Sequence, residues 1–331
     1  MTIENQQLRG SKGWVTYRPE LKVLDCTIRD GGLMNNHHFD EKLIHAVYEA
    51  CDEAGVDYME AGYKASKKIF SPEKFGAWKF CEEDDLRRMA GDKQRAVRIS
   101  VMADAGRTNY HTDILPREKS AISLIRVAAY ANQIPAAIDL IKDAHDKGYE
   151  TTVNLMAISA IKDWELDEAL ESLASSPVGA LYLVDSFGSL YSEQIAFLTQ
   201  KYLKVARAAG KEVGIHTHDN LQLAYANTIE AIIQGANWAD ASMAGLGRGS
   251  GNCRMELLLS FLHNPKFRLR PVLSCVQEHV EPMREKLRWG FGIPYLVTGH
   301  LNLHPRAAME FMEGANNRDI VKFYDATMEE E

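Results

Sequence analysis

A repeated alternation of short apolar runs and longer amphipathic segments constrains this chain more than any other feature. Between residues 21 and 262 it occurs eight times, with strand-length apolar runs and helical spacing in the segments that follow. Strands that alternate with helices form a parallel sheet. Eight units favour a closed (β/α)₈ TIM barrel. An open doubly wound sheet is the alternative, but no G-x-G-x-x-G sequence follows the first strand.

The pattern also predicts where the parts of the chain begin and end. The expected strands are residues 21–28, 57–63, 95–103, 124–129, 150–157, 180–185, 213–216 and 238–243. We expect an N-terminal arm (1–20), a catalytic barrel (21–265) and a small C-terminal helical extension (266–331). Residues 64–80 are longer than a usual strand-helix connection and are a candidate lid.

Composition narrows the class of protein. The 331 residues carry a formal net charge of −8, so no basic surface is available for a nucleic-acid partner. No apolar run approaches the ~20 residues of a membrane helix, and the N-terminus lacks the apolar core of a secretory signal. The five cysteines are scattered without a C-x-x-C pair, which indicates reduced thiols in a cytoplasmic protein.

Two histidines, His216 and His218, follow a short apolar run. Side chains alternate along a strand, so both should face the same way. Two imidazoles on one face at the end of a strand are able to bind one divalent metal. A pair of surface histidines in a turn is the alternative.

Other polar side chains gather where the predicted strands end, the edge at which TIM barrels build their sites. Asp30 would add a carboxylate ligand and Asn252 an amide oxygen, although Asn252 also suits an ordinary turn. Such a mixed set suits Mn²⁺, Mg²⁺, Co²⁺ or Zn²⁺. Arg29 is expected to hold an enolate or carboxylate, with a salt bridge to Glu60 or Asp185 as the alternative.

The remaining polar residues at strand ends are expected to bind substrate. They are Glu60, Asn154 and Asp185. His37 and His38 follow the first strand, and one of them is a candidate general base, with a solvated loop histidine as the alternative. The other histidines show no spacing that indicates a site.

Three runs carry a family resemblance: residues 27–31 (TIRDG), 216–220 (HTHDN) and 245–252 (GLGRGSGN). Together they resemble the DRE-TIM metallolyase superfamily, which includes 4-hydroxy-2-oxovalerate aldolase, HMG-CoA lyase and isopropylmalate synthase. Residues 124–128, 183–188 and 239–247 are most similar to the 4-hydroxy-2-oxovalerate aldolase branch. The resemblance covers residues 21–262 and extends loosely into the tail.

The resemblance implies that Asp30, His216 and His218 bind the divalent metal. It also implies that Arg29 stabilises the enolate oxygen of a 2-oxo acid. Asn252 matches an asparagine that is a metal ligand in some members and lies behind the ligands in others.

The chain departs from the aldolases at Leu33, where they carry an acid/base histidine. That duty would pass to His37, His38 or a metal-bound water. Tyr295 is the nearest candidate for the tyrosine that the aldolases use in their tail. Residues 64–80 have no counterpart.

The expected function is a divalent-metal-dependent aldolase that cleaves a 4-hydroxy-2-oxo acid to pyruvate and an aldehyde through a metal-bound enolate. One alternative is a Claisen-type acyltransferase that condenses acetyl-CoA with a 2-oxo acid, although residues 247–252 lack the Glu-Arg pair of the synthases. A second is a non-catalytic binding barrel. The resemblance also implies an aldehyde dehydrogenase partner, and we expect a homodimer.

Overall fold

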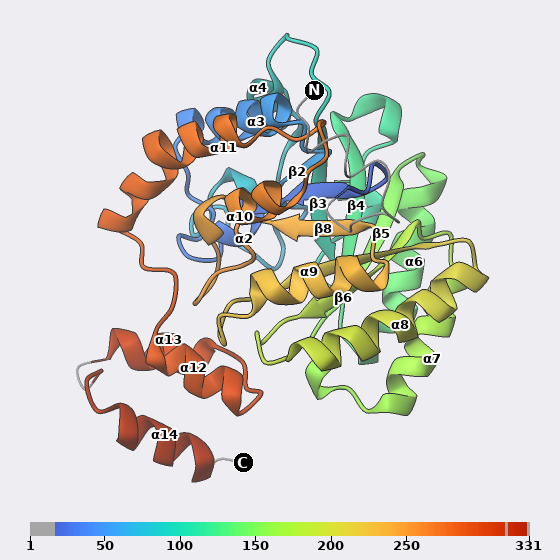
Figure 1. Ribbon diagram of the computed structural model, residues 1–331. Helices are drawn as coiled ribbons and strands as arrows, with labels where there is room; N and C mark the ends of the chain where they lie inside the picture. Colours follow the sequence, from blue (N-terminus) through green and yellow to red (C-terminus); the bar gives the residue numbers. More distant parts are fainter. Residues whose placement is uncertain (1–16, 315–316, 330–331) are drawn as a thin grey trace, which may run out of the picture.

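The computed structural model describes residues 17–314 and 317–329, and it confirms the barrel. Eight parallel strands pair in chain order, and β8 closes the sheet by pairing with β1 (Figure 1). They are β1 (Lys22–Asp25), β2 (Tyr58–Tyr63), β3 (Arg98–Asp104), β4 (Ile122–Ala129), β5 (Glu150–Leu155), β6 (Ala180–Asp185), β7 (Glu212–Thr217) and β8 (Trp238–Ala241). The open-sheet alternative is therefore wrong.

Helices follow the strands as the apolar spacing predicts. They are α2 (Thr27–Gly31), α3 (Glu41–Ala54), α4 (Glu83–Ala90), α5 (Tyr110–Asp113), α6 (Ile134–Asp146), α7 (Asp163–Ala174), α8 (Ser192–Ala208), α9 (Ala224–Gln234), α10 (Met255–Phe261), α11 (Leu269–Cys275), α12 (Ile293–His300), α13 (Arg306–Glu313) and α14 (Ile320–Glu329). The Asp40 carboxylate accepts the Lys42 N–H at the start of α3, and Gly55 ends that helix with a φ of 75°. No helix among the described residues is long and apolar enough to cross a membrane.

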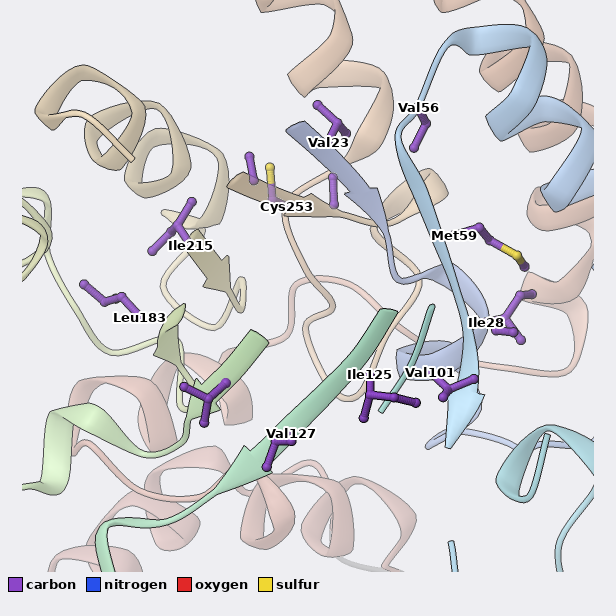
Figure 2. Packing of buried hydrophobic residues seen from close by; sticks show 14 of the residues in the cluster. Val23, Ile28, Val56, Met59, Val101, Ile125, Val127, Leu183, Ile215 and Cys253 are labelled. Carbon is purple, nitrogen blue, oxygen red and sulfur yellow. The ribbon is translucent and has the colours of Figure 1, made fainter. Parts of the chain in front are cut away.

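Side chains alternate between two apolar layers along each strand. The outer layer packs between the barrel and its helices, and Figure 2 shows members of it on several strands, among them Val23, Ile125, Leu183 and Ile215. The inner layer fills the barrel with Leu24, Cys26, Tyr58, Leu124, Ala180, Tyr182, Val184 and Trp238. The barrel is thus packed below its mouth, and only the carboxyl ends of the strands leave room for a site.

The first strand is shorter than predicted. β1 ends at Asp25, and the residues from Thr27 to Gly31 form the single turn α2 instead of continuing the strand. The Asp25 carboxylate accepts hydrogen bonds from the backbone N–H of Thr27 (3.1 Å) and from its hydroxyl (2.6 Å). These bonds favour a turn over an extended chain. As a result Arg29 and Asp30 stand on a helical turn.

The C-terminal helices confirm the predicted helical extension. α12, α13 and α14 lie together to one side of the barrel (Figure 1). The extension also reaches back to the barrel, since Nδ2 of Asn302 donates to the Ser159 carbonyl oxygen at 3.0 Å. Most of the predicted N-terminal arm, residues 1–16, lies outside the described residues.

Candidate active site

A cavity of about 180 Å³ opens at the carboxyl ends of the strands. Five of the predicted site residues line it: Arg29, Asp30, Asn154, His216 and His218. A larger hollow of about 620 Å³ lies outside the barrel beside α3 and is lined by His37 and His38 among others. It contains none of the predicted metal ligands, so the smaller cavity is the candidate active site.

The predicted metal ligands converge on one carboxylate oxygen. Oδ2 of Asp30 lies 3.3 Å from Nε2 of His216 and 3.8 Å from Nε2 of His218. The two imidazole rings have centroids 5.0 Å apart. The other ring nitrogens are held from behind: Nδ1 of His216 lies 3.0 Å from Oδ2 of Asp240, and Nδ1 of His218 lies 2.9 Å from the Asp185 carbonyl oxygen. Such bonds orient Nε2 of each ring toward Asp30.

Asn252 completes the group beside Asp30. Its Nδ2 donates to Oδ2 of Asp30 at 2.6 Å, while its Oδ1 has no partner among the described residues. Gly247 makes room for this side chain, because a Cβ there would lie 2.8 Å from Nδ2 of Asn252. A flip of the Asn252 side-chain amide would place Oδ1 beside Oδ2 of Asp30 in place of Nδ2, and a metal ligand requires that oxygen.

A closed ring of buried charges includes two of the candidate ligands, Asp30 and His216. Arg29 lies 2.9 Å from Asp30 and 2.7 Å from Glu60. Arg126 continues the ring, 3.1 Å from Glu60 and 2.6 Å from Asp240. His216 then joins Asp240 to Asp30. The Arg29 guanidinium and the two histidines help hold the pKa of Asp30 well below its usual range, despite burial that alone would raise it.

The net charge of this ring, and a ring nitrogen in it that lacks a hydrogen bond, are suited to binding a cation. Three carboxylates face two guanidiniums, so the ring carries a net charge of −1 when His216 is neutral. Nε2 of His216 is buried without a hydrogen bond among the described residues. A buried imidazole nitrogen beside a carboxylate, within a negative ring, is the donor set that a divalent metal takes.

Cys26 is a further neighbour of the ligands. Its Sγ, a carboxylate oxygen of Asp30 and a ring nitrogen of His216 lie within 4.8 Å of one another, whereas His218 is not in this tightest group. We favour His218 as the ligand, because it lines the cavity and Cys26 does not. Burial also raises the pKa of the Cys26 thiol well above its usual range, and that thiol donates to the Ala241 carbonyl oxygen at 3.4 Å.

Comparison with known proteins agrees with this architecture. Residues 20–280 match the family model described as HMGL-like. The chain belongs to the HMGL-like family. This confirms the predicted DRE-TIM relationship. Similar curated proteins include 4-hydroxy-2-oxovalerate aldolases of Bacillus thuringiensis (28% identical, covering 80% of this chain and 76% of that protein) and Geobacillus thermodenitrificans (27%, 91% and 89%).

Oxaloacetate decarboxylase of Mycobacterium tuberculosis is also similar, at 27% identity over 72% of this chain and 69% of that protein. Among solved structures, the N-terminal domain of a candidate aldolase from Bacteroides vulgatus superposes with a TM-score of 0.79, at 28% identity over 91% of this chain and 100% of that one. HMG-CoA lyase of Brucella melitensis, at 19% identity and a TM-score of 0.65 over 80% of this chain and 99% of that one, shares the fold.

Several predicted residues lie outside the cavity of this HMGL-like barrel. His37 is buried with its ring edge-on to Tyr63, at 5.4 Å between centroids, and burial lowers its pKa to about 3. Tyr295 packs against the glycine-rich segment 245–252, since a Cβ at Gly249 would lie 3.1 Å from its ring. Neither side chain lines the cavity. The arrangement therefore gives no support to a direct catalytic role for His37 or Tyr295.

Two of the predicted substrate contacts are engaged elsewhere. The Asp185 carboxylate accepts the Ser189 N–H at 3.0 Å, and the carboxylate of Glu60 is held by Arg29 and Arg126. The salt bridge that was the alternative role of Arg29 is thus present. Arg29 still lines the cavity, and its Nη2 has no partner among the described residues.

Other charged residues of the site were not predicted. Arg126 and Asp240 lie within apolar strands, and their charge at an inward position was the available signal. His304 lines the cavity and accepts from Arg248 at 3.1 Å, although its place in the sequence suggested no site. Sequence spacing could not show that the C-terminal extension reaches the mouth.

The predicted lid, residues 64–80, packs over part of the mouth. Phe70, Phe75 and Phe80 join an apolar cluster with Tyr63 and other side chains at the strand ends. Lys79, near the end of this segment, lines the cavity. The segment therefore contributes a wall of the site, and its movement as a lid stays a prediction.

Proposed function

We propose that this protein is a divalent-metal-dependent aldolase, a lyase that cleaves a 4-hydroxy-2-oxo acid to pyruvate and an aldehyde. The observation that carries the proposal is the convergence of His216, His218 and Arg29 on the carboxylate of Asp30 inside one cavity. The curated aldolase relatives and the HMGL-like family support it.

Asp30, His216 and His218 would hold the metal, with Asn252 beside them. When bound, a divalent ion supplies a Lewis acid that polarises the 2-oxo group of the substrate. The set of oxygen and nitrogen donors suits Mn²⁺, Mg²⁺, Co²⁺ or Zn²⁺. Arg29 is fixed by Glu60 and Asp30, so its guanidinium needs no rearrangement to stabilise the enolate oxygen.

Asp104 is our candidate for the general base, since Leu33 stands where the aldolases carry their acid/base histidine. It ends β3 and lines the cavity, and its carboxylate accepts no hydrogen bond from another described residue. Burial raises its pKa, although the nearby charges of Lys79 and Arg107 oppose that rise. A carboxylate with a raised pKa is a stronger proton acceptor.

The reaction then balances within the cavity. Asp104 takes the proton of the 4-hydroxyl group, and the C4–O bond becomes the carbonyl of the aldehyde. The C3–C4 bond breaks, and its electron pair forms the pyruvate enolate beside Arg29. Return of the proton to C3 completes pyruvate and restores Asp104.

The Claisen acyltransferase alternative is not favoured, because the curated relatives named above are two aldolases and a decarboxylase. An acyltransferase would release a thiol from acetyl-CoA in the presence of a 2-oxo acid. We expect no such release, which a thiol-reactive dye would measure.

The direct test is pyruvate release from 4-hydroxy-2-oxo acids of varied chain length, with Mn²⁺ and with a chelator. We expect release that the chelator abolishes, and a bound metal measured by mass spectrometry. Asp30→Asn should lose both, whereas Asp146→Asn, a change at a side chain that is 81% exposed, should lose neither. Chelator-insensitive release would contradict the mechanism, and full activity of Asp30→Asn would contradict the site.

Three related expectations stay predictions: a homodimer, an aldehyde dehydrogenase partner and a cytoplasmic location. A small-molecule substrate agrees with the relatives' names and with the size of the cavity.

A further inference from the structure

We propose that the aldehyde half of the substrate carries a negative charge, either a carboxylate or a phosphate, and that Lys79 and Arg107 bind it. This inference rests on the proposed aldolase function and adds the substrate class. It comes from two cations of the cavity that the reaction described above does not use.

Lys79 is a buried cation without an ion pair. Its side chain belongs to a residue that is only 6% exposed, and its Nζ lies 4.1 Å from the ring centroid of Tyr63 and 4.4 Å from that of Phe70. No carboxylate oxygen of a described residue lies within 4.0 Å of it. The aromatic rings offset only part of the cost of burying an ammonium group, so an anion that enters the cavity would be attracted to it.

Arg107 offers a second cation on the same side of the mouth. It follows β3 in the loop after Asp104, is exposed to solvent and lines the same cavity. Asp104 is the carboxylate nearest in the chain, yet neither cation comes within 4.0 Å of it among the described contacts. Both cations line the cavity without an ion pair among the described residues, so a ligand anion in the cavity could contact them.

Cationic residues outnumber carboxylates along the wall of the cavity. Four lysine and arginine residues line it against two carboxylates, Asp30 and Asp104. Asp30 is engaged by Arg29 and the histidines. This leaves Asp104 as the carboxylate of the cavity that faces Lys79 and Arg107.

The positions of the candidate metal ligands indicate which end of the substrate meets these cations. Asp30 follows β1 and the two histidines belong to the end of β7, so the 2-oxo acid end lies on that side. Lys79 and Arg107 follow β2 and β3, which are neighbours in the barrel. The part of the substrate beyond C4 would extend toward them. A cavity of about 180 Å³ has room for a short tail, so the expected product is a small aldehyde with a carboxylate or a phosphate group.

The test compares three 4-hydroxy-2-oxo acids that differ in the group on C4, which is a methyl, a carboxylate or a phosphooxymethyl group. We expect kcat/KM for pyruvate release to favour one of the anionic tails over the methyl tail by at least about tenfold, as charge-assisted contacts usually do. The better of the two anionic tails identifies the carboxylate or the phosphate as the natural group.

Variants of Lys79 and Arg107 test whether these two cations cause the preference for an anionic tail. Lys79→Met with Arg107→Gln should reduce the ratio of the two kcat/KM values to within about twofold. Arg107→Gln alone, a change at an exposed residue, should reduce it in part and covers the case in which the double variant does not fold. Lys68→Met, at an exposed lysine of the same segment that does not line the cavity, should leave the ratio unchanged.

Different failures have different meanings. Equal cleavage of the methyl and anionic tails would overturn the tail assignment and leave the aldolase proposal standing. So would a variant that lowers kcat/KM equally for all tails, because the cations would then act on Asp104 or on the fold. Cleavage of none of the three acids would overturn the proposed function itself.

Discussion

Asp240→Asn is the change that tests most directly how the barrel interior sets the metal site. Asp240 is fully buried, and its Oδ2 lies 2.6 Å from Nη2 of Arg126 and 3.0 Å from Nδ1 of His216. The carboxylate selects the tautomer of His216 with the proton on Nδ1, which leaves Nε2 as the donor that faces Asp30. Asparagine keeps the shape and removes the charge.

Two effects of this change have predictable sizes. Loss of a carboxylate behind a metal-ligating histidine typically lowers metal affinity by about 10- to 100-fold, or about 1.4–2.8 kcal/mol. Removal of one partner from a buried ion pair costs about 3–5 kcal/mol of folding stability. We expect the lower end here, because Arg126 keeps Glu60 at 3.1 Å and the ring of Tyr182 at 4.4 Å.

The assays are urea unfolding for stability and calorimetric titration of Mn²⁺ into the chelator-treated protein for affinity. Asp146→Asn, on an exposed acid, is the matched control and should change neither quantity. A folded Asp240→Asn protein whose affinity for Mn²⁺ stays within twofold of the wild type would refute the argument. It would show that Asp240 pairs with Arg126 for stability alone.

Three further variants test other parts of the structure. Gly32→Ala should destabilise by about 1–3 kcal/mol in urea unfolding, since its Cβ would lie 2.0 Å from Nδ1 of His37. Arg29→Lys should lower kcat/KM for pyruvate release by about 100-fold, because an ammonium group does not reproduce the fixed guanidinium; an unchanged value would contradict its role. Burial raises the pKa of Asp25 from 3.8 to about 7, so the folded state binds its proton more tightly than the unfolded chain. Its stabilisation is lost as pH rises from about 4 to about 7, and in urea melts Asp25→Asn should gain stability relative to the wild type between pH 5 and pH 8.

The fold was predictable because it depends on repeated local patterns. Apolar runs and helical spacing give the number and order of the elements without any knowledge of long-range contacts. The end of β1 was predicted wrongly because it depends on side-chain hydrogen bonds and not on the apolar pattern. The hydrogen bonds from Thr27 to the Asp25 carboxylate turn the chain two residues before Arg29. Because Ile28 is apolar, the sequence pattern there still resembles a strand.

The site was predictable only where its residues sit in compact motifs. His216 and His218 share a strand end, so their alternation predicts their common direction. The link from Arg126 to Asp240 joins positions 114 residues apart, and no periodicity reports which inward side chains meet. The proposed base is a similar case: Asp104 comes directly after the predicted strand 95–103, but only the packed barrel shows that it lines the cavity while His37 does not.

The charge ring also explains why a proton and a metal should compete for this site. Burial lowers the pKa of His216, but the carboxylates of Asp240 and Asp30 beside its ring outweigh burial and raise the pKa overall. A proton on Nε2 would neutralise the ring's net charge of −1, and a divalent ion takes the same nitrogen and leaves the ring at +1. The carboxylate of a 2-oxo acid would then restore neutrality. We therefore expect the affinity for Mn²⁺ to fall as pH is lowered below the pKa of His216, and the affinity for pyruvate to depend on bound metal. Titrations at pH 6 and pH 8 measure both, and a metal affinity independent of pH would contradict His216 as a ligand.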